Sequence, residues 1–527
     1  MVGRETLYYN ARIWTGLDTP RFAGSFRVKD GRVVELLESS TCRPGETDAV
    51  DLGGRFVSPG LIDAHVHLLM GGESLRHVDL SRATSPAEFQ EAIAEAHEAR
   101  EPGEWLIASG WSESNWDSTT PPDKTWLACC GDRPVVCWRM DLHAALVNDA
   151  VLEKLALPDD ATLASEGGRV VRDDAGGATG LLQEAAAWMY LIPRIPPLPP
   201  QQRAEALVAA QRHCLELGLV AVRSMEYTKD VREYYLPTRG PGGLRLSIVQ
   251  LDRVLPLELE WMAEVPTDEW LRVTGCKSFV DGTFGSRTAR MFEAFADGQD
   301  NRGMWTDHAL EGRLAEWVDE VVAGQRSPVM HAIGDEAVYL ALETVRDRHE
   351  SCRATIEHAQ IVTPRVMDLV AATPGIRLSM QPWHRATDAV YAQQALGSER
   401  TASMMPLASL AKAGARLSFG SDWPVVTVDP LAGMEAAITG RDSRGRPFHA
   451  EECLDMETVL RGYTVEAAEA SQLEGSGSLA IGHLADFVTW DHDPFDVDWA
   501  RVRPRILSTF VGGEQVAGTV PVQETAS

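Results

Sequence analysis

The sequence predicts an α/β protein: a (β/α)8 TIM barrel, a small β-sandwich domain formed from both termini, and a large insertion after the first barrel strand. Three observations lead to this prediction. The middle of the chain contains eight strand-like segments, most of them separated by segments of helical periodicity. Short alternating segments with tight turns occupy both ends. The first two barrel strands are too far apart for a loop to join them.

The two ends of the chain, residues 1–58 and 472–527, are expected to form the small β-sandwich domain. TLYYNARIW and SFRVKDGRVVELL alternate between apolar and polar residues, and Asp30-Gly31 marks a hairpin turn. ADFVTWDHD and ILSTFVGGEQV have the same pattern near the other end. Because the ends of a domain often lie close together, one domain built from both segments is the simplest arrangement.

Residues 59–471 are predicted to form the barrel. Apolar residues at helical spacing predict helices over 203–218, 312–324 and 335–349. Eight strands with helices between them match the (β/α)8 count. The predicted strands are residues 58–68, 219–225, 244–250, 271–280, 328–334, 354–360, 376–382 and 415–422.

Residues 70–200 are predicted to form a subdomain inserted into the barrel. The insertion ends in the proline-rich run PRIPPLPP, which indicates a stiff connector. It also holds six of the chain's 15 tryptophans, and this suggests an apolar or aromatic small-molecule substrate. These tryptophans are Trp105, Trp111, Trp116, Trp126, Trp138 and Trp188.

Composition excludes several classes of partner. The formal net charge of -28 argues against nucleic acid and anionic membranes, which bind basic surfaces. No segment approaches the length of a membrane span, and the N-terminus lacks the apolar core of a secretory signal. The eight cysteines are scattered without a CxxC pair, which indicates free thiols. We therefore expect a cytoplasmic protein.

Residues that bind metals stand at the ends of the predicted barrel strands. Two histidines spaced i, i+2 close the first strand and lie on one face. Others end the fifth and sixth strands, a lysine lies in the fourth, and an aspartate follows the eighth. Active sites of such barrels are built at the strand C-termini, so these side chains are expected to converge on a metal site. They are His65, His67, Lys277, His331, His358 and Asp422.

Lys277 is unusual because it is expected in the core. It shares a small, apolar face of the predicted strand with Val273 and Phe279, and an unpaired ammonium group there is costly. Lysine is also rare here, since six of the 49 basic residues are lysine. A lysine that extends from a strand edge to solvent is the structural alternative.

Together, these motifs resemble the amidohydrolase superfamily, specifically the amidohydrolase-3 branch that includes N-substituted formamide deformylases. The matching segments are SPGLIDAHVHL, KSFVDGTFGSRTA, VMHAIGDEAV, IEHAQIV, FGSDWPV and GSLAIGHLADFVTWDHDP, with GWSESNWD and RMDLHAALVN in the insertion. The resemblance covers essentially the whole chain. It implies a metal-dependent hydrolase that cleaves a C–N amide-type bond, as in an N-substituted formamide, an N-acyl compound or a cyclic amide.

The resemblance also implies roles for the six candidate ligands. His65 and His67 bind one metal, His331 and His358 bind a second, and Lys277 bridges the two as N6-carboxylysine. Asp422 binds the first metal and moves protons for a metal-activated hydroxide. Arginine could not replace this lysine, because it stays protonated and cannot add CO2. Two Zn2+ per subunit are expected, although other divalent metals suit such ligands, and the family pattern suggests a homodimer.

Five further residues lie in family-like segments and are candidates for substrate binding: Trp111, His143, Arg287, Gln381 and His384. Each also has a structural interpretation. Arg287 could pair internally, His384 could lie on a surface loop, and Trp111 could pack inside the insertion. Asp335 is expected to orient His331 from behind.

Two other functions remain compatible with the pattern. A mononuclear deaminase could use the same scaffold, although the family pattern implies that such members usually lack the lysine of the fourth strand. A non-catalytic assembly protein could also derive from the barrel, although such relatives typically lose ligands that this chain keeps. A serine hydrolase is excluded because no GxSxG motif occurs.

Overall fold

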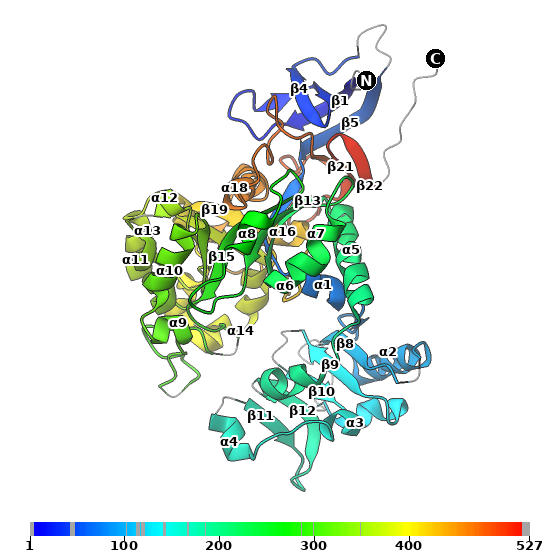
Figure 1. Ribbon diagram of the computed structural model, residues 1–527, viewed down its shortest axis with the longest axis vertical. Coiled ribbons are helices and arrows are strands. Elements are labelled where there is room, and N and C mark those ends of the chain that lie inside the picture. Colours follow the sequence, from blue (N-terminus) through cyan, green and yellow to red (C-terminus); the bar gives the residue numbers. More distant parts are fainter. Residues whose placement is uncertain are drawn as a thin grey trace. The chain divides into compact units, whose positions relative to one another are not determined.

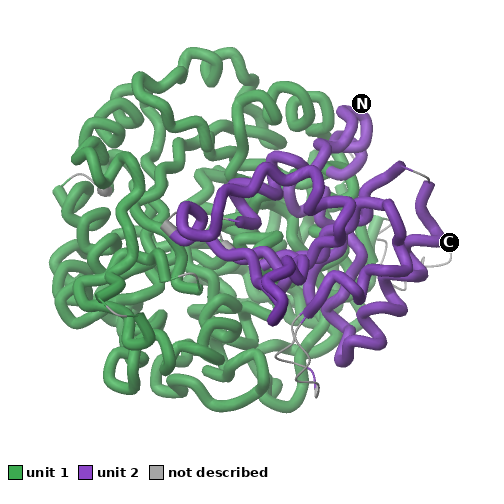
Figure 2. The backbone as a smooth tube through the Cα atoms, turned by 90° about the horizontal axis from the view of Figure 1, so that it is seen from below, with its two compact units in different colours: residues 1–69, 207–527 green, residues 70–206 purple. Residues whose placement is uncertain are grey.

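The computed structural model describes residues 5–42, 48–101, 103–111, 116, 122–140, 144–165, 168–184, 186–285, 287–298, 300–347 and 349–518. The chain divides into two units. Unit 1 comprises Met1–Leu69 with Leu207–Ser527, and unit 2 comprises Met70–Ala206 (Figure 2). Unit 2 begins where the insertion is predicted to begin and extends beyond its predicted end.

Unit 1 contains the predicted eight-stranded parallel sheet. Its order is β19-β18-β17-β16-β15-β14-β13-β6, so each strand pairs with the next one along the chain. Most strand residues are buried on both faces, which explains why these segments are so rich in apolar residues. The strands are β6 (Leu61–Val66), β13 (Leu219–Glu226), β14 (Arg245–Gln250), β15 (Leu271–Phe279), β16 (Ser327–Ala332), β17 (Thr355–His358), β18 (Arg377–Met380) and β19 (Arg416–Phe419).

The first and last strands nearly close this sheet into a barrel. A parallel bridge joins Val66 to Trp423, and His67 N donates to Trp423 O at 2.8 Å. Asp422 N donates to His65 O at 2.7 Å. The closure therefore brings the histidines of β6 beside the aspartate that follows β19, as the barrel prediction requires.

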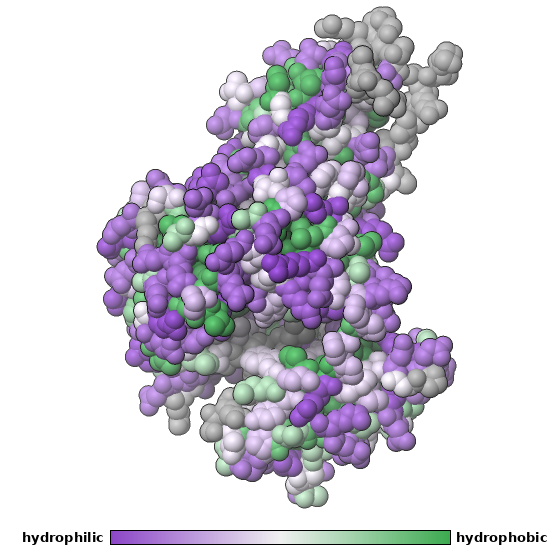
Figure 3. Space-filling model, viewed as in Figure 1, coloured by the Kyte–Doolittle hydropathy of each residue, from purple (hydrophilic) through white to green (hydrophobic). Residues whose placement is uncertain are grey.

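Helices connect the barrel strands (Figure 1). Both α10 and α11 contact β16. The three predicted helices correspond to α5 (Pro200–Glu216), α10 (Leu314–Ala323) and α11 (Asp335–Val345). The other main helices of unit 1 are α13 (Pro364–Ala371), α14 (Pro382–Arg400), α15 (Leu407–Lys412), α16 (Pro430–Thr439), α17 (Met456–Gly462) and α18 (Val465–Ala470). No helix in the described ranges is long and apolar enough to cross a bilayer, and hydrophilic residues cover most of the face in Figure 3.

Segments from both ends of the chain form a second sheet in unit 1. Its order is β22-β21-β20-β5-β1-β3-β4, with β2 on β1. The sandwich prediction envisages two facing sheets, but the central β5 pairs with β1 on one side and β20 on the other, so the strands form one hydrogen-bonded sheet. The strands are β1 (Glu5–Trp14), β2 (Phe22–Ala23), β3 (Ser25–Lys29), β4 (Arg32–Leu37), β5 (Ala49–Pro59), β20 (Phe487–Trp490), β21 (Ile506–Val511) and β22 (Glu514–Gly518).

Two contacts show how this terminal sheet joins the barrel. Gly60 alone separates β5 from β6, and a Cβ there would come within 2.4 Å of the Val220 side chain, so the close approach requires glycine. A buried ion pair joins Arg245 of β14 to Asp486 beside β20, with Nε–Oδ2 at 2.5 Å and Nη2–Oδ1 at 2.9 Å. This bidentate pair fixes the sheet to the barrel.

Unit 2 is built on a six-stranded sheet of order β11-β12-β10-β9-β8-β7. Two apolar clusters contain the predicted tryptophans: Trp111, Trp116 and Trp126 belong to one, and Trp105, Trp138 and Trp188 to the other. Its elements are β7 (Val78–Asp79), α2 (Pro86–Glu98), β8 (Leu106–Trp111), β9 (Val135–Arg139), β10 (Ala144–Val147), β11 (Gly168–Arg172) and β12 (Ala178–Glu184).

Candidate metal centre

The six predicted ligands lie at or near the C-terminal ends of barrel strands. His65 is in β6 and His67 follows it, Lys277 is in β15, and His331 is in β16. His358 ends β17, and Asp422 follows β19. Five of the six are buried, and His67 is partly buried. Lys277 is only 1% exposed, which rules out a lysine that extends to solvent from a strand edge.

The first group of donors surrounds His65. The Lys277 Nζ lies 2.9 Å from His65 Nε2, and Asp422 Oδ1 lies 3.2 Å from the same nitrogen. His67 Nε2 is 3.5 Å from Asp422 Oδ1. One donor atom each from His65, His67 and Asp422 lies within 4.8 Å of the others, a spacing that a single metal ion can span.

A second group shares Asp422 with the first. One donor atom each from His358, His384 and Asp422 lies within 4.8 Å of the others. The ring centroid of His331 is 4.5 Å from that of His358. The structure therefore brings the six predicted ligands together, and it adds His384, which the sequence suggests as a substrate residue.

Hydrogen bonds on the far side of each imidazole set which nitrogen faces the centre. His65 Nδ1 donates to Glu357 Oε2 at 2.5 Å, and His358 Nδ1 donates to Gln381 Oε1 at 2.8 Å. Since a carbonyl can only accept, His331 Nε2 donates to Gly282 O at 3.0 Å. The opposite nitrogen of each ring therefore keeps its lone pair for a cation.

Glu357 lies beside the predicted ligands but is not among the residues that the sequence singles out. It is fully buried in β17 and pairs with Arg223 of β13, at 3.4 Å between Oε1 and Nη1. The available signal was an acidic residue and an arginine within apolar strands, because a buried charge needs a partner. Their sequence positions do not reveal that the partner of Glu357 is also His65.

The predicted orienting role of Asp335 is not found. Asp335 Oδ1 accepts a hydrogen bond from Phe292 N at 2.9 Å, at the start of α11. The carboxylate beside His331 is instead Asp281, whose Oδ1 is 3.7 Å from His331 Nε2. Asp281 follows β15, so the segment after Lys277 supports the neighbouring ligand.

Burial keeps three of the four predicted imidazole ligands in the neutral form that binds metals. Desolvation, assisted by the charge of Lys277, lowers the pKa of His67 and of His331 to about 3. Burial also lowers the pKa of His358, to well below its ordinary value, and that of Lys277. Three imidazoles are therefore neutral, and the amine form of Lys277 is favoured.

The two carboxylates around His65 have the opposite effect. Burial and Lys277 lower the pKa of His65, but Glu357 and Asp422 outweigh them and raise it above its usual value. Burial raises the pKa of Asp422, but the imidazoles of His65, His358 and His67 together lower it well below its usual range. The two carboxylates therefore favour positive charge at His65.

Two of the predicted ligands have strained backbones. His358 has φ of 73° and Asp422 has φ of 62°, a left-handed region that non-glycine residues rarely occupy. Such strain persists where the surrounding structure fixes it, often at functional sites. Here it accompanies the turns that direct both side chains toward the centre.

The substrate candidates have different outcomes. Arg287 forms the internal pair that is its structural alternative, with its guanidinium bound to Asp297 Oδ2 at 2.7 Å. Trp111 packs inside unit 2, which is its structural alternative: it is 1% exposed, and its Nε1 donates to Cys137 O at 2.8 Å. Gln381 orients His358, as described above. His143 lies outside the described residues.

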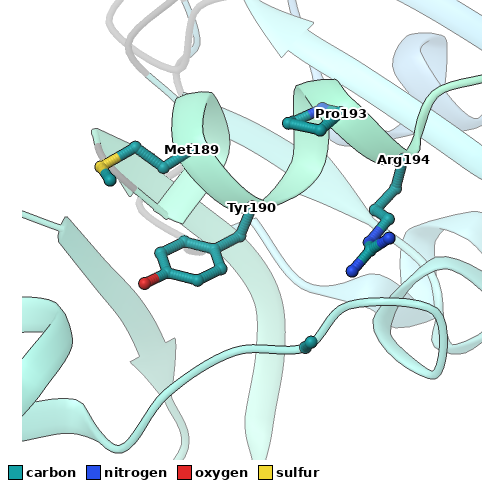
Figure 4. Close-up of a pocket in the computed structure, with 5 residues that line it drawn as sticks. Met189, Tyr190, Pro193 and Arg194 are labelled. Atoms are coloured by element: carbon teal, nitrogen blue, oxygen red, sulfur yellow. The ribbon is translucent and has the colours of Figure 1, made fainter.

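A small cavity occurs in unit 2. The residues that line it are far in the sequence from the predicted metal ligands. It is lined by Ala156, Met189, Tyr190, Pro193 and Arg194 and has a volume of about 310 Å³ (Figure 4). Its lining holds no histidine, cysteine or carboxylate.

The donor set fits a divalent metal. Neutral imidazoles, an ionised carboxylate and a buried amine are suitable ligands or precursors of ligands, and orienting partners lie behind three of the rings. A parallel barrel with this constellation at its strand ends defines the class of metal-dependent hydrolases. Within that class, the chain belongs to the amidohydrolase family, whose model matches residues 48–517.

Relatives support this assignment over nearly the whole chain. Protein LONG AFTER FAR-RED 3 of Arabidopsis thaliana is 30% identical, covering 97% of this chain and 91% of that protein. Putative amidohydrolase YtcJ of Bacillus subtilis is 29% identical, covering 97% and 99%. An uncharacterised metal-dependent hydrolase from Pyrococcus horikoshii has a TM-score of 0.75 at 25% identity, covering 94% of this chain and 99% of that one.

Proposed function

We propose that this protein hydrolyses a C–N amide-type bond with divalent metal ions held by His65, His67, Lys277, His331, His358 and Asp422. The observation that carries the proposal is the buried convergence of Lys277, His65 and Asp422, with 2.9 Å and 3.2 Å separating the lysine and the aspartate from one imidazole nitrogen. N-Substituted formamide deformylase of Arthrobacter pascens, 25% identical over 97% of this chain, supports amides as the substrate class.

Metal ions bound in this centre would act as Lewis acids that polarise the carbonyl and lower the pKa of water. The protein's own groups supply the rest. Asp422, ionised among three imidazoles, can accept a proton on Oδ1 and pass it to the leaving nitrogen. Glu357, Gln381 and Gly282 hold the imidazoles of His65, His358 and His331 in place.

Lys277 is proposed to bridge two ions as N6-carboxylysine. Its amine form is favoured by burial, and only a neutral amine can add CO2. The resulting carbamate would supply anionic oxygen ligands between the two histidine pairs. The buried position of Lys277, 2.9 Å from the His65 imidazole, also favours hydrolysis over the mononuclear deaminase, for which such a lysine has no evident use.

Lys277→Ala is expected to remove metal and activity together. The expected loss of activity is about 100-fold or more, because the effect should exceed the 10–100-fold typical of an outer partner. The measurement is metal content per chain, alongside hydrolysis of a panel of N-substituted formamides, N-acyl amino acids and cyclic amides. Chelator-stripped wild type should be inactive until Zn2+, Mn2+ or Co2+ is restored. Full activity in stripped protein would refute the proposal.

A further inference from the structure

We propose that His384 is an additional metal ligand, which binds the same ion as His358 and Asp422. The inference rests on the proposed metal-dependent function. It extends that function to the segment after the seventh barrel strand, which supplies none of the six proposed ligands. His384 lies four residues after β18, in the first turn of α14. The sequence suggests it only as a substrate or surface residue.

The position of the ring is the first argument. His384 stacks on His358 with ring centroids 6.2 Å apart and an interplanar angle of 10°. Donor atoms of the two imidazoles and an oxygen of Asp422 all lie within 4.8 Å of one another. Three donors at this mutual spacing match the first coordination sphere of one ion.

The unsatisfied nitrogen is the second argument. His384 is 7% exposed, and its Nε2 is buried with no hydrogen-bond partner among the residues that the structure describes. A buried polar atom without a partner is costly, and a metal ion would satisfy it. A surface-loop interpretation does not account for a nitrogen that is shielded from solvent.

Hydrogen bonds fix the backbone around His384 and so hold its ring in place. His384 N donates to Gln381 O at 2.9 Å, and the Thr387 hydroxyl donates to His384 O at 3.1 Å. Gln381 also accepts from His358 Nδ1 at 2.8 Å. One turn thus orients one imidazole of the pair and carries the other, which couples their positions.

The test compares metal binding by the full-length wild type, His384→Ala and His358→Ala after chelator treatment. Each protein is titrated with Co2+ and with Zn2+ against a competing chelator, and the Co2+ absorption spectrum is recorded. We expect His384→Ala to lower the affinity for one of the bound ions by about tenfold or more and to change the Co2+ absorption spectrum. His358→Ala is expected to have the same two effects. His492→Ala, at a 54% exposed side chain, is the matched control and should bind like the wild type.

The outcomes separate this inference from the proposed function. If the wild type binds metal and His384→Ala binds it with unchanged affinity and spectrum, His384 is not a ligand. If the wild type binds no metal, the proposed function fails as well. Thermal unfolding of the metal-free forms checks that each variant folds. If His384→Ala misfolds, it is replaced by His384→Gln, which keeps a similar volume and must show the same loss of metal affinity. Retained wild-type affinity in that folded variant would overturn the inference.

Discussion

At the scale of single residues, His65 is the most constrained donor of the centre. One nitrogen is held by Glu357, and the other faces Lys277 and Asp422. The tautomer is therefore fixed from outside the metal site. Arg223 in turn pairs with Glu357, so a chain of buried charges connects the barrel interior to the ligand.

Glu357→Gln should weaken metal binding by about 10–100-fold, because the amide carries no charge and does not select one tautomer of His65. Metal affinity is measured by competition with a chelator. Glu311→Gln, on a largely exposed side chain, is the control. An affinity equal to that of wild type would show that Glu357 does not orient His65.

The residues that the sequence could identify are recognisable by their own type and position, whereas those that it could not identify depend on their partners in the folded chain. Lys277 and the histidines are residue types that bind metals and stand in predicted strands, and the structure places them at or near the ends of those strands. The partners of Arg287 and Gln381 depend on which distant segment folds beside them, and this is set by tertiary packing. Asp297 is ten residues from Arg287 but His358 is 23 from Gln381, and no local pattern distinguishes either pairing.

At the scale of elements, a buried hydrogen-bond group fixes the segment that follows β6. Glu226, at the end of β13, accepts from the Ser224 hydroxyl at 2.5 Å and from the Tyr235 hydroxyl. Leu69 N donates to Tyr235 OH at 3.0 Å. This group therefore anchors the chain just after His67.

Glu226 should make stability depend on pH. Burial raises its pKa to about 7, so the folded protein favours the protonated acid. The stabilisation is present below the ordinary pKa of glutamate and is lost as pH rises through about 7. Relative to Glu226→Gln, which keeps an acceptor but does not titrate, the wild-type melting temperature should fall between pH 5 and about 8. Parallel melting curves for the two proteins would contradict this.

The barrel strands were the most predictable elements, because both faces of a parallel sheet are buried and their sequences are correspondingly apolar. All eight overlap their predicted ranges. The terminal sheet was less predictable. Alternation identifies its strands, but it does not reveal that β5 pairs with partners on both sides and so forms one sheet.

At the scale of the whole molecule, the terminal sheet and the barrel of unit 1 share a buried ion pair. Arg245 and Asp486 have side chains that are 1% and 3% exposed, and Asp486 also accepts from Gly512 N at 2.7 Å. Arg245, the first residue of β14, is thus neutralised by Asp486, which lies 241 residues further along the chain. Removing either partner would leave an uncompensated buried charge.

Asp486→Ala should reduce the free energy of unfolding by about 3 kcal/mol or more, as expected for a broken buried pair. Arg245→Met combined with Asp486→Leu should recover part of the loss, because no lone charge remains. Urea denaturation of Asp486→Ala, the double variant and wild type measures this. A double variant no more stable than Asp486→Ala would contradict the explanation.

The terminal sheet cannot be completed until the C-terminal strands have been synthesised. β5 leaves the ribosome before β6 and the rest of the barrel, but its neighbour β20 is made only after β19. Until then, one edge of β5 has no strand beside it and Arg245 has no counter-ion. The nascent chain must therefore carry an open strand edge through translation of the whole barrel, a period in which it is vulnerable to aggregation and in which a chaperone would bind.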